Sequence, residues 1–193
     1  MPFEASFVAP PAKVFDGLDS IYNNVSCINC HRNDGGGFPS AGSATSGLLI
    51  RISQTGSDPH GGPLAVDGYG TQVQDQAVLG YDPEASVVIG YAESVFTYPD
   101  GTTANLRKPA YTLQNPYLPF QVPYMLSPRL APPLVGIGLL DDIPESTIRS
   151  FVDEEDQNGD GITGKLNMVY DDYSEETSFG RFGLKANTAT LLT

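Results

Sequence analysis

The first regular hydrophobic pattern of the chain lies between Pro11 and about Asn24. Its apolar positions are Val14, Phe15, Leu18, Ile21 and Tyr22. They recur at intervals of three and four residues, which is the spacing of one face of a helix. The pattern therefore predicts a helix over residues 11–24. The glycine run at 35–37 follows it and predicts a loop that ends the segment.

The middle of the chain has β-like patterns. Residues 47–52 form a short, mostly apolar run that predicts a strand. Two β-branched and aromatic runs, 87–91 and 95–98, precede the turn sequence Pro-Asp-Gly-Thr at 99–102. A returning strand over 104–113 is expected to break at Pro109. We therefore predict a β-hairpin insertion within residues 80–115.

The C-terminal part combines loops with a further predicted helix. The proline-rich segment 115–133 is incompatible with a long helix. Pro144 and Glu145 have the residue types that begin a helix, and Ile148, Phe151 and Val152 are expected to form its buried face. Together the patterns predict one domain over residues 1–193, mainly α, with short β-hairpin insertions and long loops.

Composition and charge narrow the classes of partner. The 193 residues include 21 Gly and 16 Pro, which favours long ordered loops between short elements. The net charge of −13 argues against nucleic acid and against an anionic membrane surface. It suits a soluble protein that meets basic partners or binds cations, as acidic redox proteins do when they attract cationic donors. The alternative is that the charge only keeps the protein soluble. Since no run of 18 apolar residues occurs, we expect no insertion into a membrane.

The most specific signal is the sequence Cys27-Ile28-Asn29-Cys30-His31. This C-x-x-C-H pattern is typical of covalent attachment of a c-type haem. The thiols of Cys27 and Cys30 would bind the haem vinyl groups from one face of a helical turn. His31 would be the proximal ligand of the haem iron. The motif thus predicts a cytochrome c-like haem domain.

Two other chemistries use a C-x-x-C pair. A structural zinc site needs four ligands, and the chain offers only Cys27, Cys30, His31 and His60. A thioredoxin-like redox pair lies between a strand and a helix, whereas a predicted helix precedes this motif and a glycine-rich loop follows it. Both alternatives are therefore weaker than haem attachment.

The second axial position of the iron has several candidates. Met125 lies in an apolar, proline-rich loop, and a His/Met ligand pair raises the reduction potential. His60 is the second choice and Met168 the third. Each of the three also has an ordinary structural or surface role available to it. An open position that binds peroxide or oxygen is a further alternative.

Arginines are candidate partners of the haem propionates, because the guanidinium fork matches a carboxylate. Arg107 and Arg129 stand in dense motifs, Leu-Arg-Lys-Pro and Ser-Pro-Arg-Leu-Ala-Pro, and Arg181 stands in Gly-Arg-Phe-Gly. Ordinary ion pairs in an acidic protein are the alternative for each.

A calcium-like loop begins at Asp156. It has the pattern D-x-N-x-D-G, the first half of an EF-hand loop. Its calcium ligands would be Asp156, Asn158, Asp160 and the carbonyl of Ile162. Position 12 is Asn167 rather than the usual glutamate, so the loop is incomplete. A self-stabilised Asx-turn loop is the alternative.

Several motifs in order give a family resemblance. They are Ser26–Gly37, Tyr69–Gln74, Asp100–Gly101, Leu106–Pro109, Ser127–Pro132, Gly136–Leu140, Asn158–Gly164 and Gly180–Ala186. The chain resembles, from about residue 14 to 187, the bacterial di-haem oxidoreductases often called thiol oxidoreductase-like, relatives of the di-haem cytochrome c peroxidases. Members of this family carry a second C-x-x-C-H motif in a C-terminal domain, and these 193 residues contain one.

The resemblance implies a haem domain that couples electron transfer to peroxidase-like chemistry, with a second haem domain as partner. We therefore expect an N-terminal fragment of a two-haem protein. Since covalent haem attachment takes place outside the bacterial cytoplasm, we expect a periplasmic or extracytoplasmic protein whose leader peptide is absent from this sequence. A mono-haem electron carrier without catalysis is the alternative function, and an extracellular calcium-binding module is a third.

Overall fold

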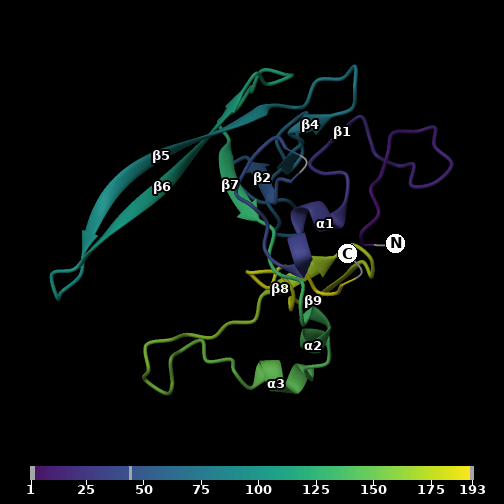
Figure 1. Ribbon diagram of the computed structural model, residues 1–193. Helices are drawn as coiled ribbons and strands as arrows, with labels where there is room; N and C mark the ends of the chain where they lie inside the picture. Colours follow the sequence, from purple (N-terminus) through teal and green to yellow (C-terminus); the bar gives the residue numbers. More distant parts are fainter. Residues whose placement is uncertain (1–2, 44, 192–193) are drawn as a thin grey trace. The chain divides into compact units, whose positions relative to one another are not determined.

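The computed structural model describes residues 3–43 and 45–191 (Figure 1). The chain forms two compact units. Unit 1 consists of Met1–Gly56 and Pro63–Pro133, and unit 2 consists of Ser57–Gly62 and Leu134–Thr193. The short segment Ser57–Gly62 therefore belongs with the C-terminal third of the chain rather than with its neighbours in sequence.

The prediction of a mainly α fold is wrong. The α-helices of the described residues have four, five and five residues, whereas two strands have twelve residues each. The helices are α1 (Cys27–Cys30), α2 (Ile137–Asp141) and α3 (Glu145–Arg149), with a 3-10 turn η1 at Arg32–Asp34. All the strand pairs are antiparallel. The described residues thus form several small antiparallel sheets joined by long loops.

The helix predicted over residues 11–24 is absent. Phe15 has φ 54° and Gly17 has φ 130°, so the backbone turns inside the predicted helix. Val8 N–H donates to the carbonyl of Phe15, and Leu18 N–H donates to the carbonyl of Val8. Val14 is 69% exposed, so the helical spacing of apolar residues does not correspond to a buried face here.

The core of unit 1 lies on a three-stranded sheet. β2 (Leu48–Ser53) pairs with β3 (Gln72–Val73) on one side and with β7 (Met125–Leu130) on the other. Burial alternates along β2, as expected for a strand with one covered face. The core residues are Leu48, Ile50, Ile52, Val66, Tyr69, Val73 and Ala85. The strand predicted over 47–52 is therefore confirmed.

The other strands of unit 1 form two smaller sheets. β1 (Ile21–Tyr22) pairs with β4 (Gln76–Ala77). A long hairpin consists of β5 (Ser86–Thr97) and β6 (Thr103–Gln114), drawn in teal in Figure 1. The expected break at Pro109 is absent, because β6 continues through this residue.

Unit 2 contains α2, α3 and a hairpin of β8 (Met168–Asp171) and β9 (Glu176–Phe179). The buried face predicted for the helix after Pro144 is largely wrong. Ile148 is half-buried, but Phe151 is 76% and Val152 is 39% exposed. These side chains line an open cavity of about 470 Å³ rather than a filled core.

Candidate haem-attachment site

The haem motif occupies α1, a single helical turn with a polar cap. Ser26 is extended and buried, and its hydroxyl oxygen accepts a hydrogen bond from Asn29 N–H at 3.3 Å. His31 N–H donates to the carbonyl of Cys27 at 2.9 Å, which closes the turn. This turn places the two cysteines three residues apart, close to one full turn of an α-helix.

The two thiols are free and differ in their surroundings. Cys27 is exposed and Cys30 is half-buried. The Cys30 Sγ lies 3.3 Å from the carbonyl oxygen of Ser46, to which it donates. Burial raises the pKa of the Cys30 thiol, partly opposed by a hydrogen bond with Asn24. One thiol is therefore open to solvent and the other is held at the edge of the packed loop.

The imidazole of His31 is oriented by the backbone. Its Nδ1 lies 2.8 Å from the carbonyl oxygen of Pro132. Since a carbonyl only accepts hydrogen bonds, Nδ1 is the donor, and in the neutral imidazole the lone pair is therefore on Nε2. This is the usual arrangement of a metal-binding histidine, in which one nitrogen is fixed by a carbonyl and the other binds the metal.

A close crossing of two glycines holds Pro132 near His31. Ala131 N–H donates to the carbonyl of Gly47 at 2.8 Å, and Gly37 N–H donates to the carbonyl of Ala131 at 3.0 Å. A Cβ on Gly47 would lie 2.9 Å from the carbonyl oxygen of Cys30. The glycine loop after the motif thus packs directly against the end of β7 and against α1.

The three candidate arginines have different surroundings. Arg129 is half-buried in β7, on the face opposite the core, and its side chain has no hydrogen bond or ion pair with any described residue. Arg107 is exposed on β6, with its Cζ 4.1 Å from the centre of the Tyr91 ring. Arg181 donates to the carbonyls of Leu140 and Asp141 at the end of α2. Arg129 alone of the three lies on the strand that leads to Pro132.

The candidates for the second axial position do not lie beside His31 within unit 1. Met125 begins β7 and pairs with Ser53, whereas Pro132 follows the other end of that strand. The five steps from Met125 to Leu130 span about 17 Å. His60 belongs to unit 2, where its ring stacks on Tyr170 at 3.8 Å, and Met168 belongs to β8 of the same unit.

Comparison with protein families identifies the chain. The family model described as "Di-haem oxidoreductase, putative peroxidase" matches residues 1–193. The chain belongs to the di-haem oxidoreductase family. No curated protein and no solved structure matches it. The family resemblance of the sequence is therefore confirmed, and haem and oxidoreductase chemistry belong to the family as a whole.

The aspartate loop of this di-haem oxidoreductase chain is folded on itself. Asp156 has φ 49°, and its carboxylate accepts from Gly161 N–H at 3.1 Å. Asn158 and Asp160 each accept from the N–H two residues further on, that of Asp160 and that of Ile162. Residues 3–43 and 45–191 contain no group of three or more His, Cys, Asp or Glu side chains placed for a metal ion. Calcium binding stays a prediction.

Some residues of the site have no signal in the sequence patterns. The role of Pro132 was not predicted, although it ends the motif Ser127–Pro132 that supports the resemblance. Asp75, 8% exposed, accepts from Gly42 N–H at 2.8 Å and from Asn23, and burial raises its pKa. Both contacts join segments far apart in sequence, which periodicity does not reveal.

In the described part of the chain, no helix is long and apolar enough to span a membrane.

Proposed function

We propose that Cys27 and Cys30 bind one haem c covalently and that His31 is the proximal ligand of its iron. The observation that carries the proposal is the hydrogen bond from His31 Nδ1 to the Pro132 carbonyl. It fixes the tautomer in which Nε2 is available to a metal. When bound, the haem supplies reversible one-electron oxidation and reduction.

The residues around the motif fit such a group. The exposed thiol of Cys27 is accessible to a haem vinyl group, and the half-buried Cys30 lies one turn further on. The Pro132 carbonyl keeps the imidazole oriented. The guanidinium of Arg129 has no hydrogen bond or ion pair among the described residues, and it suits a haem propionate. Arg107, a second candidate from the sequence, is stacked on Tyr91.

The proposed role is electron transfer within a di-haem oxidoreductase that has peroxidase-like chemistry. Membership of the di-haem family supports a second haem domain as the partner of this chain. The net charge of −13 supports a basic protein as its redox partner. Covalent attachment implies maturation outside the cytoplasm, so we propose a periplasmic or extracytoplasmic location.

Pyridine haemochrome spectroscopy tests the proposal on protein matured by a cytochrome c maturation system. We expect the spectrum of a haem whose vinyl groups are both saturated, at one haem per chain. His31→Ala is expected to keep the attached haem but to change the axial ligation seen in the visible spectrum. A chain without haem, or with haem that solvent extracts, would contradict the proposal.

A second measurement separates catalysis from electron carriage. The haem-loaded chain is reduced and then mixed with hydrogen peroxide, and turnover is followed with an artificial electron donor. Because the 193 residues contain one C-x-x-C-H motif, we expect single-electron reduction and reoxidation with little peroxide turnover. Sustained turnover by this chain alone would instead assign peroxidatic chemistry to this haem.

A further inference from the structure

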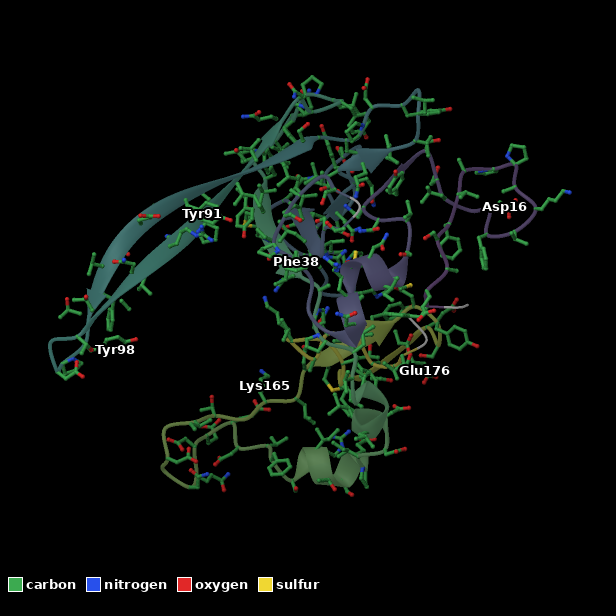
Figure 2. All side chains as sticks on the ribbon, viewed as in Figure 1. Asp16, Phe38, Tyr91, Tyr98, Lys165 and Glu176 are labelled. Carbon is green, nitrogen blue, oxygen red and sulfur yellow. The ribbon has the colours of Figure 1, made fainter. Side chains whose placement is uncertain are left out.

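The hairpin of β5 and β6 has an edge without a partner. β5 and β6 form a two-stranded sheet, and no other described strand pairs with either. Figure 2 shows Tyr91 midway along the hairpin and Tyr98 near its tip. Tyr91, Val95 and Phe96 are 45%, 66% and 46% exposed. A long edge strand with exposed apolar side chains is a template for pairing with another strand.

The turn of the hairpin fixes which backbone groups face outward. Tyr98 N–H donates to the carbonyl of Thr102 at 2.8 Å. Hydrogen-bonded and non-hydrogen-bonded pairs alternate along an antiparallel ladder. The next pair, Thr97 with Thr103, is therefore non-hydrogen-bonded, as is every second pair beyond it. The odd-numbered residues of β5 consequently direct their N–H and C=O groups away from β6.

The outer edge of β6 is protected, and that of β5 is not. Pro109 pairs with Tyr91 and so occupies an outward-facing position of β6. A proline there removes an outward N–H without loss of a hydrogen bond to β5, and it blocks the addition of a strand. β5 contains no proline in its twelve residues. The open edge is therefore that of β5.

The two halves of β5 on either side of Ala92 carry residues of similar size or branching at four of five positions. Positions at equal distances from Ala92 are Tyr91 and Glu93, Gly90 and Ser94, Ile89 and Val95, Val88 and Phe96, and Val87 and Thr97. Two copies of β5 that run antiparallel about an axis at Ala92 therefore place Gly90 opposite Ser94 and the β-branched residues opposite β-branched or aromatic ones. The remaining pair sets Tyr91 opposite Glu93. Such self-complementarity is what a two-fold interface requires.

Charge also matches in this register. Glu93 lies opposite Arg107 within the hairpin but has no ion pair among the described residues. The Arg107 guanidinium instead stacks on Tyr91, 4.1 Å from the ring centre. With the axis at Ala92, Tyr91 of one copy faces Glu93 of the other. Each guanidinium then lies beside the carboxylate of the second copy, so opposite charges meet although the chain carries −13 overall.

We propose that β5 pairs with β5 of a second copy of the chain, antiparallel and centred on Ala92. The product is a four-stranded sheet in the order β6-β5-β5-β6, with the outward backbone groups of β5 hydrogen-bonded across a two-fold axis. The pairing uses residues of the hairpin alone and is independent of haem attachment.

Sedimentation analysis of the haem-loaded chain over a concentration series tests the pairing with a matched set of variants. Val95 and Asn105 lie opposite each other at an outward-facing pair, Val95 on β5 and Asn105 on β6. Val95→Pro removes an outward N–H from the proposed interface, and we expect the dimer dissociation constant to rise about tenfold or more. Asn105→Pro makes the same change on the other edge and is expected to leave the dissociation constant unchanged. A wild-type chain that stays monomeric, or equal effects of the two prolines, would overturn the proposal.

Disulfide cross-linking tests the register. Ala92 would face its own copy at a non-hydrogen-bonded pair, where the Cα atoms are about 4.5 Å apart. Ala92→Cys is therefore expected to give a cross-linked dimer on mild oxidation, identified by peptide mapping at position 92. Gly90→Cys is the matched control, because the two positions 90 would be four residues out of register. Cross-linking at 90 that equals that at 92 would overturn the pairing centred on Ala92.

Discussion

His31 Nδ1 donates a hydrogen bond to the carbonyl oxygen of Pro132, which lies 2.8 Å away and 101 residues further along the chain. This contact joins the haem motif to the end of β7, the strand that carries Arg129. The orientation of the proposed iron ligand therefore depends on the packing of the end of β7 against the loop that follows the haem motif. The five residues of the haem motif alone do not fix the orientation of the His31 ring.

The glycine crossing beside the motif should be sensitive to a single methyl group. A Cβ on Gly47 would lie 2.9 Å from the Cys30 carbonyl oxygen, and the neighbouring atoms are backbone. We expect Gly47→Ala to lower the free energy of unfolding by about 2 kcal/mol or more. Chemical denaturation measures the change. Gly138→Ala is the control, because a Cβ there meets nothing within 4 Å and its φ is not positive; equal effects would contradict the account.

Glu84 should make stability depend on pH in a defined direction. Glu84 is 6% exposed, and burial raises the pKa of its carboxyl above the ordinary value of 4.5. Between the two pKa values the folded state therefore binds more protons than the unfolded state. The contribution of the protonated carboxyl to the free energy of unfolding is fully present below pH 4.5. It is lost as the pH rises through the raised pKa of the folded state.

Glu84→Gln removes the charge and can keep the hydrogen bond from Gln74 N–H, which Glu84 accepts at 2.6 Å. We expect the free energy of unfolding of the variant to depend less on pH than that of the wild type. Relative to the wild type, the variant should therefore gain stability as the pH rises from acid to neutral. Unfolding free energies of both proteins across that range measure the difference. A constant difference between the two would show that Glu84 is not the titrating group.

Met125 should not ligate the haem iron. It begins β7, about 17 Å before the end of the strand that leads to Pro132. Met125→Leu is expected to leave the visible spectrum and the reduction potential of the haem-loaded chain unchanged. The loss of a methionine-to-iron absorption band in this variant, or a fall in potential, would show instead that the methionine is the second axial ligand.

Calcium should stabilise the chain if the aspartate loop binds it as its sequence predicts. Addition of calcium at 100 times the dissociation constant would raise the free energy of unfolding by about 2.7 kcal/mol. Thermal unfolding of the wild type, with calcium or with chelator, measures the effect. The double change of Asp156 and Asp160 to Asn should abolish it, whereas Asp67→Asn, an exposed acid outside the loop, should not. Identical wild-type curves would rule out a stabilising calcium site.

The sequence allowed prediction of the family better than of the fold. The strand at 47–52 was predictable because one face of β2 is buried and the alternation is regular. The hydrophobic spacing at 11–24 resembled a helix, but Phe15 and Gly17 turn the backbone and most of the side chains stay accessible. Pro109 suggested a broken strand, yet it occupies an outward position of β6 where no ladder hydrogen bond is needed.

The candidate site was predictable where its residues are adjacent in sequence. Cys27, Cys30 and His31 lie in five consecutive residues, so their spacing alone indicated the chemistry. The Pro132 carbonyl and the Gly37–Gly47 crossing depend on pairing between β2 and β7, which no local pattern reveals. Backbone groups carry no side-chain signature, and their roles become visible only in the fold.

The most direct test of the account is the intact mass of the matured chain under denaturing conditions. We predict that wild-type protein is heavier than its sequence by the mass of one haem. The single changes Cys27→Ala and Cys30→Ala should each weaken attachment, and the double change should abolish it. A wild-type chain at its bare sequence mass, with any haem removed by acidified solvent, would contradict covalent attachment at Cys27 and Cys30.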